Sequence, residues 1–378
     1  MKMHTKITGC LNTLLFVGLA AAGCLGYQGQ AKAAQECRFG DGSGGTTTLA
    51  NSTYDTPIRW YAKSNGTMWL LASFDVDLSP TLTSHCSAGN DGRQLAYKNA
   101  DGNTRGRGPQ PDGGMGTYYT TNVPGVYYSV KIFSSAGGGY FGDGNTGDMA
   151  GWTDLVSDPG SNIWDGKTWK AHVNVYQDTD EFYNRIGGNT AQATYISPSG
   201  SYPLGQMTLG DPSDSNNHAW TFNVTPSSFR VPIMASTCEH AQLDSGSNTI
   251  DLGEYMLSDF NTSPVSHPFR VQLTGCNNVY AVKYKMTASK LTGPDNSLLG
   301  NMLNNGAEGI GVKILSDHNR TLFVQVMPGE ESDGIFSPDT NPGASLGLTD
   351  FKAQLVRDGN PLKAGNFTAM TTFQITYY

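Results

Sequence analysis

Four polar side chains in the first half of the 378-residue sequence have the chemistry to bind hydroxyl groups: Asn90, Asp91, Gln177 and Asp178. An amide side chain carries donors and an acceptor, so it can engage two adjacent hydroxyl groups of a sugar at once. A fixed carboxylate forms a stronger, charge-assisted hydrogen bond. We therefore interpret these residues as candidate ligands of a glycan.

Three aromatic residues lie in the segment between these polar positions: Tyr140, Trp152 and Trp164. An aromatic ring can cover the apolar face of a sugar, so the three are candidate rings or walls of a pocket. A structural interpretation stays open for the whole set. Asn-Asp-Gly also favours a turn, and tryptophans of a loop can equally pack inward.

Catalysis and metal binding find no support in the spacing of the residues. The segment Asp143–Asp148 resembles a calcium loop, but Gly and Asp occupy its fifth and sixth positions in the wrong order, and no Glu follows at the twelfth. The chain contains no G-x-S-x-G, H-E-x-x-H or phosphate-loop motif. We expect no metal, no cofactor and no enzyme activity.

The composition indicates which elements must position these residues. With 47 Gly, 18 Pro and only 15% charged residues, the chain favours short strands and many turns over a helical bundle. The net charge of −8 excludes a nucleic-acid binder, which needs a basic surface. We expect an all-β protein without a nucleic-acid partner.

The first 33 residues are typical of a secretory signal peptide. Lys2 and Lys6 precede the apolar run 11–22, and Ala31-Lys32-Ala33 has the small residues of a cleavage site. Four of the six cysteines remain after cleavage: Cys37, Cys86, Cys238 and Cys276. Four cysteines allow three pairings, and nearest-neighbour pairing places one disulfide in each half of an exported chain.

Apolar residues alternate along several short segments, as expected for strands with one buried face. The segment 169–175 is one example, with apolar residues at 169, 171, 173 and 175. After the extended segment 229–233, strand-like segments follow one another at shorter intervals along the sequence. We therefore predict a first domain over residues 34–228, a linker over 229–236 and a second domain over 237–378.

The last strand of the chain is the most informative segment. From Gly365 onward, Phe367, Ala369, Phe373, Ile375 and Tyr377 fall on one face, and we expect the strand to end at the carboxyl terminus itself. The pattern alone also suits an ordinary closing strand of a β-sandwich.

Residues 237–378 resemble the subunits of chaperone–usher fimbriae. The resemblance rests on this C-terminal strand with its penultimate Tyr, on Leu273-Thr274-Gly275-Cys276, on the segment 309–312 and on Phe351-Lys352-Ala353. It implies an immunoglobulin-like fold that lacks its last strand, with the five alternating residues lining a groove. A periplasmic chaperone, an outer-membrane usher and the donor strand of the next fimbrial subunit are the implied partners.

The first domain resembles the lectin domain of the mannose-specific type 1 fimbrial adhesin. The resemblance rests on Cys37 near the mature N-terminus, on Asn90-Asp91 after Cys86, on the turn 134–138, and on Gln177 with Asp178 and Asp180 beyond it. It implies a second immunoglobulin-like or jelly-roll sandwich in which these polar residues bind a sugar. Two extra residues before Asn90, a long insertion at 138–166 and the missing N-terminal aromatic residue argue against mannose itself.

Only three residues separate the expected cleavage site from Cys37, so we expect no N-terminal donor strand. A subunit that accepts a strand without donating one belongs at the fimbrial tip. The sequence therefore predicts a tip adhesin, secreted through the periplasm to the cell surface, that binds a host glycan. The alternatives are an adhesin for a host matrix protein such as collagen or fibrinogen, a secreted glycan-active enzyme, and a tip pilin without a receptor.

Overall fold

The computed structural model describes residues 37–64, 66, 68–87, 94–100, 103–142, 151–156, 163–185, 193–210, 212, 218–318, 322–334 and 339–378. Nearly all regular elements are strands, which confirms the expected all-β class. The helical elements of these residues are the short helix α1 (Thr179–Arg185) and the two 3-10 turns η1 (Leu257–Asn261) and η2 (Pro294–Asn296). None of them is long and apolar enough to cross a membrane. The expected signal peptide lies outside the described residues.

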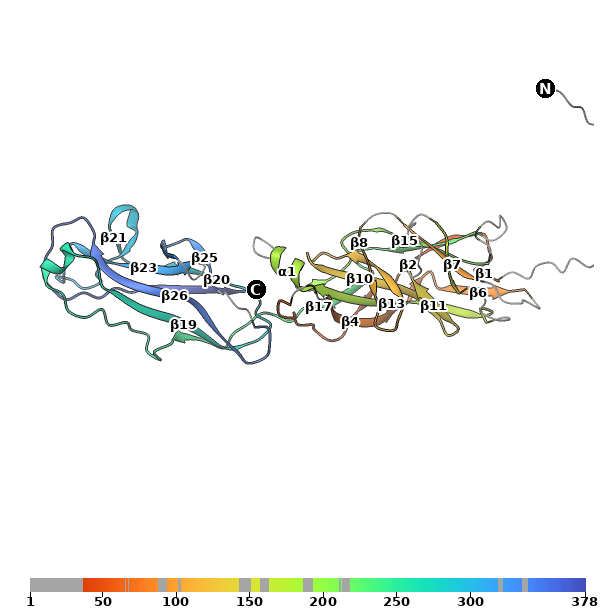
Figure 1. Cartoon of the computed structure of the whole chain (residues 1–378), viewed down its shortest axis with the longest axis horizontal. Helices are drawn as coiled ribbons and strands as arrows, with labels where there is room; N and C mark the ends of the chain where they lie inside the picture. The colour runs from red at the N-terminus through yellow and green to blue at the C-terminus, as the bar shows by residue number, and fades with distance from the viewer. Residues whose placement is uncertain are drawn as a thin grey trace, which may run out of the picture.

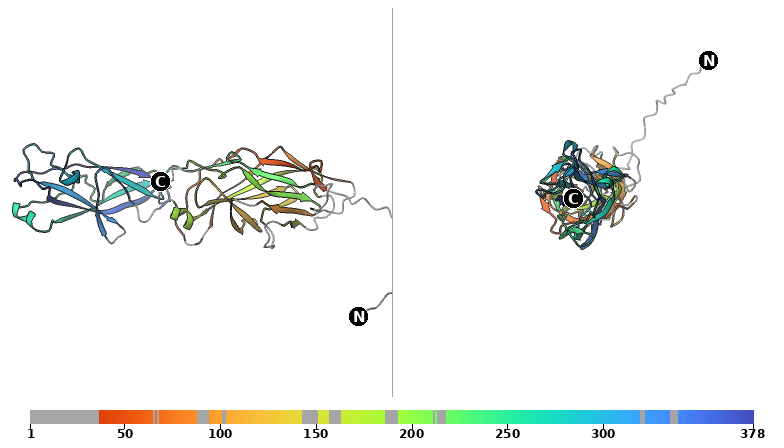
Figure 2. Two further views of the ribbon diagram at one scale, coloured as in Figure 1. Left: turned by 90° about the horizontal axis from the view of Figure 1, so that it is seen from above. Right: turned by 90° about the vertical axis from the view of Figure 1, so that its left-hand side faces the viewer.

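Two β domains lie end to end along the long axis of the molecule (Figures 1 and 2). Each has its own hydrophobic core: one is built from residues between Cys37 and Val231, the other from residues between Phe269 and Leu355. The carboxyl terminus lies beside the junction of the two domains (Figure 1).

The first domain packs two main sheets and a small one around its core. The larger sheet runs in the spatial order β1 (Cys37–Phe39), β6 (Leu82–Cys86), β13 (Lys167–Asp178), β10 (Val126–Ser134), β9 (Met115–Thr120) and β8 (Thr104–Pro109), with β11 (Gly137–Tyr140) paired to β10 and β4 (Met68–Val76) paired to β13. The second sheet runs in the order β12 (Thr153–Val156), β7 (Leu95–Asn99), β15 (Tyr202–Leu209), β16 (Trp220–Val224), β2 (Gly45–Leu49) and β5 (Leu78–Ser79). The small sheet contains β14 (Tyr195–Ile196), β17 (Phe229–Pro232) and β3 (Ser52–Thr53).

The second domain has two sheets. The larger runs in the order β18 (His240–Leu243), β19 (Ser266–Cys276), β26 (Ala344–Arg357), β23 (Ile310–His318), β22 (Leu298–Leu299) and β21 (Leu291–Thr292), with β24 (Leu322–Gln325) paired to β23. The smaller contains β25 (Glu331–Asp333), β20 (Val282–Thr287) and β27 (Thr372–Tyr377).

Strand β13 shows how the alternating sequence produces this architecture. Trp169, Ala171, Val173 and Val175 belong to the core of the first domain, as period-2 alternation predicts. The residues between them point to the opposite face of the sheet, where His172 and Asn174 bond to β4. β13 therefore supplies the core with one face and an outer surface with the other.

The predicted linker at 229–236 begins too early. Residues 229–232 form β17, and the side chains of Phe229 and Val231 are fully buried in the first core. Their alternation buries apolar surface against β14 and β3, so this segment closes the first domain. The connection to the second domain is correspondingly shorter and leads directly to Cys238.

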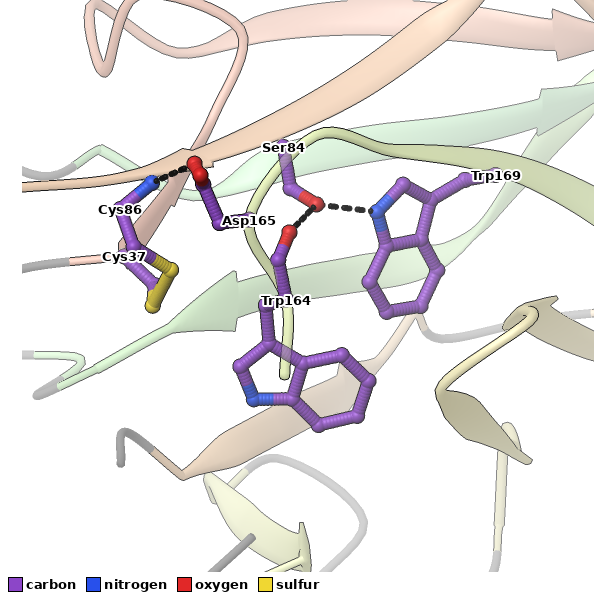
Figure 3. Close-up of a disulfide and its surroundings, with 6 residues drawn as sticks. All are labelled: Cys37, Ser84, Cys86, Trp164, Asp165 and Trp169. Carbon is purple, nitrogen blue, oxygen red and sulfur yellow. Dashed lines mark hydrogen bonds between the residues drawn. A yellow bond between two sulfur atoms is a disulfide. The ribbon is translucent and has the colours of Figure 1, made fainter. Parts of the chain in front are cut away.

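Disulfides join Cys37 to Cys86 and Cys238 to Cys276, one in each domain. The first links β1 to β6 at the end of the first domain that lies away from the junction (Figures 1 and 3). Beside it, Asp165 accepts a hydrogen bond from the backbone N–H of Cys86, and the Ser84 hydroxyl donates to the carbonyl of Trp164 and accepts from the indole of Trp169 (Figure 3). This polar frame holds the segment before β13 against β6.

The junction between the domains is packed and hydrogen-bonded. Trp60 contacts Phe182 with ring centroids 4.4 Å apart, and Tyr280 of the second domain packs edge-on against both. The buried side chain of Asn278 accepts a hydrogen bond from the backbone N–H of Trp60 at 2.8 Å and donates to the carbonyl of Met234. Side chains from both domains therefore form one small continuous core.

Candidate functional site

Gln177 stands at the end of β13 but points into the protein. Its side chain is 0% exposed, accepts a hydrogen bond from the backbone N–H of Tyr61 at 2.7 Å and donates to the carbonyl of the same residue. The amide thus pairs with a backbone segment in the way that a neighbouring strand would. The prediction of Gln177 as a sugar ligand is wrong for this conformation, because both ends of the amide are used inside the fold.

Asp178 and Asp180 also have structural partners. Asp178 accepts from the backbone N–H of Glu181 and so caps the first turn of α1, and it forms an ion pair with Arg105. Asp180 accepts a hydrogen bond from the backbone N–H of Gly66 at 2.6 Å. Unlike Asp178, which is buried, Asp180 is half-buried and reaches the surface.

The structure does not bring this end of β13 toward Cys86. The first residues of β13 pair with β6, which ends at Cys86, whereas Gln177 pairs with Trp69 at the other end of the strand. Lys167 and Gln177 are ten residue steps apart along the strand, which corresponds to roughly 33 Å at the rise of an extended strand. Asn90 and Asp91 lie outside the described residues, so their role stays a prediction.

Of the three candidate rings, two are buried. Trp164 stacks on Trp169 in the core, and Tyr140 is covered by the residues around it. Because both rings are buried, neither offers an exposed face on which a sugar could stack, and their role as pocket walls stays a prediction. Trp152 is half-buried just before β12 and keeps part of its ring at the surface.

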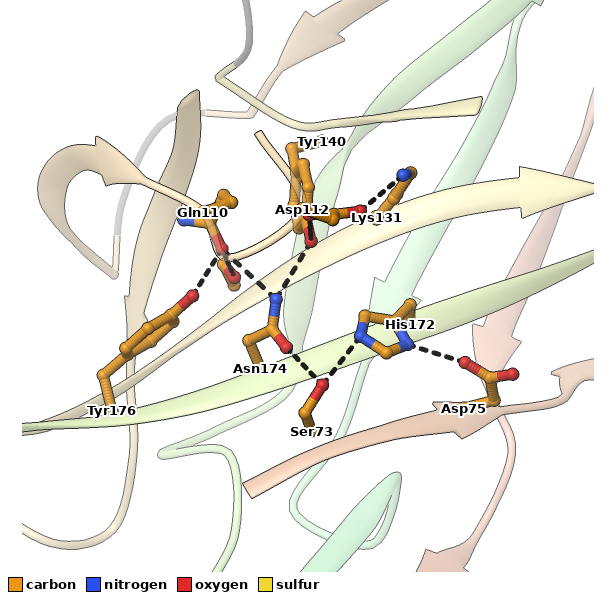
Figure 4. A network of polar contacts seen from close by, with 10 residues as sticks. Ser73, Asp75, Gln110, Asp112, Lys131, Tyr140, His172, Asn174 and Tyr176 are labelled. Carbon is orange, nitrogen blue, oxygen red and sulfur yellow. Dashed lines mark hydrogen bonds and ion pairs between the residues drawn. The ribbon is translucent and has the colours of Figure 1, made fainter. Parts of the chain in front are cut away.

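A polar surface that the sequence did not single out covers the outer face of the larger sheet (Figure 4). The register of β11, β10, β13 and β4 places Tyr140, Lys131, His172 and Asp75 in one row across four strands. The next row holds Ser129, Asn174 and Ser73. Because side chains on one face recur every second residue, all of them point outward from the sheet.

Hydrogen bonds connect the two rows into one network (Figure 4). His172 lies 2.6 Å from Asp75 through Nδ1 and 2.9 Å from the Ser73 hydroxyl through Nε2. Ser73 donates to Asn174, and Asn174 donates to the Tyr140 hydroxyl at 2.9 Å. The network thus runs from a carboxylate on β4 to a hydroxyl on β11.

The segment after β8 folds over one end of this face. The Gln110 carbonyl oxygen accepts from the hydroxyls of Ser129 and Tyr176, at 2.6 and 2.7 Å, so Gln110, Ser129 and Asn174 are all buried. Asp112 of the same segment accepts from Tyr140 and from Lys131, each at 2.6 Å. Gln110 therefore covers Ser129 and Asn174 at one end of the polar surface. We call the segment that contains Gln110 and Asp112 the wall segment.

The charges on this face occur as pairs. Burial acts to raise the pKa of Asp112, but the hydrogen bonds from Lys131 and Tyr140 outweigh it and leave the pKa below its usual range. Burial, and then the bond to Asp112, raise the pKa of the Tyr140 hydroxyl, which stays protonated as a donor. We call Ser73, Asp75, Asp112, Lys131 and His172 the lateral polar face.

The lateral polar face offers carboxylates, an ammonium group, a hydroxyl and an imidazole within one patch. Beside it, the half-buried ring of Phe133 packs edge-on against His172. Such a set can bond hydroxyl groups and cover a small apolar surface at the same time. The alternation over residues 169–175 predicted that His172 and Asn174 face away from the core, but the cover by Gln110 and Asp112 depends on contacts that are distant in the sequence. No group of three His, Cys, Asp or Glu side chains among the described residues is placed to hold a metal ion.

The second domain presents a different candidate surface. β27 pairs with β20 on one edge, and no described strand pairs with its other edge. The five residues predicted to line a groove, Phe367, Ala369, Phe373, Ile375 and Tyr377, are all half-buried and pack against the second core. Further half-buried apolar residues, Ile250, Leu252 and Tyr255, pack against the same core. The described residues therefore cover this apolar row only in part.

Comparison with known proteins identifies the second domain. Residues 227–378 match the family model described as "Fimbrial protein". The S-fimbrial protein subunit SfaG of Escherichia coli O6:K15:H31 (strain 536 / UPEC) is 29% identical over 160 residues, which cover 38% of this chain and 78% of that protein.

The whole chain is similar in fold to a solved tip adhesin. The CupB6 tip adhesin from Pseudomonas aeruginosa aligns with a TM-score of 0.52 at 14% identity, over 91% of this chain and 94% of that one. The P pilus rod subunit PapA covers 38% of this chain and 100% of its own length, at 18% identity and a TM-score of 0.27. Together with the family match and SfaG, the two-domain fold confirms the expected likeness to a tip adhesin of chaperone–usher fimbriae, a cell-surface protein exported through the periplasm.

Proposed function

We propose that this fimbrial subunit attaches the bacterium to a host glycan through the lateral polar face of its first domain. The observation that carries the proposal is the hydrogen-bonded network in which Asp75, His172, Ser73 and Asp112 come together from two strands, β4 and β13, and a covering segment. Neither the core nor the disulfide requires this network, since it lies on the outer side of the sheet.

The chemistry of the face favours a glycan with hydroxyl groups over a strongly charged ligand. Lys131 pairs with Asp112, and His172 lies against Asp75, so the face has no large excess of one charge. Prearranged donors and acceptors lose little freedom when a ligand binds, because their side chains are already held by neighbours.

In the second domain, the proposed partner is a donated β-strand. The unpaired edge of β27 offers backbone N–H and C=O groups, and the half-buried apolar row offers sites for alternate side chains of the incoming strand. A periplasmic chaperone would supply this strand before assembly at the outer-membrane usher, and the next subunit would supply it in the fimbria.

The glycan proposal is tested with the full chain, purified as its chaperone complex, on an array of glycans and matrix proteins. We expect binding to at least one glycan, and at least tenfold weaker binding for His172→Ala and for Asp112→Ala. Asp41→Ala is the matched control, because Asp41 is an exposed carboxylate of the same domain that bonds only within its own turn. Binding to collagen or fibrinogen alone, or full glycan binding by both variants, would contradict the proposal.

The strand-acceptor proposal is tested by co-expression with the chaperone. Phe373→Asp should abolish co-purification, because a charge would enter the apolar row. Phe323→Asp, on a half-buried Phe of the other sheet in the same domain, should retain the chaperone. If both variants co-purified equally well with the chaperone, strand donation at β27 would be wrong.

A further inference from the structure

We propose that the stacked side chains of Tyr61 and Trp69 form a second saccharide site, an aromatic platform beside the domain junction. This inference rests on the proposed function, in that it assigns the first domain a second surface for glycans. The platform is separate from the lateral polar face, because Trp69 lies at the junction end of β4. There it pairs with Gln177, one residue before the end of β13.

The two rings are exposed where burial would be expected. Tyr61 is 41% and Trp69 is 38% exposed, while most large side chains of the first domain are buried. Their ring centroids are 4.8 Å apart and the planes differ by 19°, so the rings stack on each other in a parallel arrangement. Exposed, rigid aromatic side chains are typical of surfaces that bind a ligand.

The backbone that carries Tyr61 is held from several sides. Gln177 bonds both the N–H and the carbonyl of Tyr61, and the hydroxyl of Tyr183 donates to the same carbonyl at 2.8 Å. Three residues further on, the hydroxyl of Thr179 bonds to the backbone of Ser64. The ring is therefore presented on a fixed segment, which lowers the entropy lost on binding.

Polar side chains lie along the same segment and on α1. The Lys63 ammonium donates to the Asn184 side chain at 3.3 Å, and Asp180 accepts from the N–H of Gly66. Together these groups provide a positive charge, a negative charge, hydrogen-bond donors and hydrogen-bond acceptors. The chemistry fits a pyranose ring whose C–H face stacks on the aromatic platform while its hydroxyl groups reach Lys63, Asn184 and Asp180.

The polar residues that were first interpreted as direct ligands acquire a different role in this proposal. Gln177 becomes a positioning residue, because it holds Tyr61 without reaching the surface. Asp180 keeps its role as a contact for sugar hydroxyls, because its side chain is half-buried and bonds to the backbone of Gly66, which follows Tyr61 in the same segment.

The test uses the full chain as its chaperone complex and saturation-transfer NMR with methyl glycosides of galactose, glucose, mannose and N-acetylglucosamine. We expect at least one glycoside to receive saturation, with its C–H face closest to the protein. Trp69→Ala and Tyr61→Ala should each weaken its binding at least fivefold, whereas Tyr61→Phe should bind within twofold of the unchanged chain.

Tyr195→Ala is the matched control, since Tyr195 is a tyrosine of the same domain with 36% exposure and packs against Arg230 instead. The control should bind within twofold of the unchanged chain. Full binding by Trp69→Ala, equal loss in Tyr195→Ala, or no saturation of any glycoside would overturn the platform. If His172→Ala loses the array signal while Trp69→Ala binds the glycoside as tightly as the unchanged chain, the platform fails while the proposed function stands.

Discussion

Several polar residues of the first domain that have the chemistry of ligands are used to stabilise the fold instead. Gln177 has the side-chain chemistry of a sugar ligand, yet its amide acts as a replacement for a missing backbone pair, with both bonds made to Tyr61. Asp178 has the chemistry of a ligand too, but it caps α1 and pairs with Arg105. Residue type alone does not separate these roles, because a buried amide needs the same donors and acceptors that a sugar would provide.

The two hydrogen bonds between the Gln177 side chain and the backbone of Tyr61, which we call the Gln177 clamp, lead to a stability prediction. Gln177→Ala should lower the free energy of unfolding by about 1–3 kcal/mol, because the N–H of Tyr61 loses its partner and the carbonyl of Tyr61 keeps the Tyr183 hydroxyl but loses the Gln177 amide. The measurement is urea denaturation of the purified chain. Gln206→Ala is the control: Gln206 is half-buried on β15 and makes a 3.2 Å bond to Thr221, so we expect a smaller loss. Equal losses in the two variants would contradict the clamp.

The lowered pKa of Asp112 predicts how the wall segment responds to acid. The ionised carboxylate stabilises the folded chain at any pH above its ordinary value of 3.8, and this contribution is lost as the pH falls through the lower folded value. The stability difference between the unchanged chain and Asp112→Asn should therefore be constant near neutral pH and shrink below 3.8.

Denaturation midpoints across an acid pH series provide the measurement for Asp112. In a Lys131→Met background the difference should already be smaller at neutral pH, because the ammonium partner of the carboxylate is gone. A difference that grew as the pH fell would show that the pKa of Asp112 is raised, contrary to the account.

At the scale of elements, alternation explains most of what could be predicted from the sequence. The segment 169–175 is a strand with the expected faces, and the C-terminal segment becomes β27 with its apolar row half-buried. Each disulfide joins cysteines within one domain, as nearest-neighbour pairing suggested.

The site could not be predicted in the same way. Which end of β13 lies beside Cys86 depends on its antiparallel pairing with β6 and β4, and this pairing is invisible in a local pattern. The wall made by Gln110 and Asp112 requires contacts with β10 and β13 across the sheet. For the same reason, the exposure of Tyr61 and Trp69 became apparent only in the folded chain.

The two disulfides should contribute similar stability to their domains. Their sequence separations are 49 and 38 residues, so loop closure in the unfolded chain gives about 4 kcal/mol for each in the entropic model. Replacing both cysteines of one bridge by alanine should lower the unfolding transition of that domain and leave the other transition in place. Calorimetry of the two double variants is the measurement, and a loss shared by both transitions would contradict separate domains.

At the scale of the whole molecule, the junction couples the first domain to the second domain. Trp60 and Phe182 of the first domain meet Tyr280 of the second, whose pKa is raised to about 12 by burial and then by the neighbouring Tyr378. The C-terminal residue also bonds through its backbone to residues 280 and 281. The end of the chain just after β27 is therefore part of the junction.

Removal of the Tyr280 ring should loosen this junction. For Tyr280→Ala we expect a broader distribution of interdomain distances in small-angle scattering, since the ring is the second domain's contact with both Trp60 and Phe182. Tyr255→Ala is the control, because Tyr255 packs within the second domain, against Phe260. Unchanged scattering in Tyr280→Ala would mean that the hydrogen bonds of Asn278 hold the domains without the ring.

The central claim is that the chain forms a receptor-binding head joined to a fimbria by a domain that accepts a strand. Electron microscopy of intact fimbriae, with gold-labelled antibodies against the first domain, tests it most directly. We predict label at a single end of each fibre, together with loss of that label when Phe373→Asp blocks docking. Label distributed along the shaft would contradict the account, because a subunit repeated in the shaft must donate a strand as well as accept one.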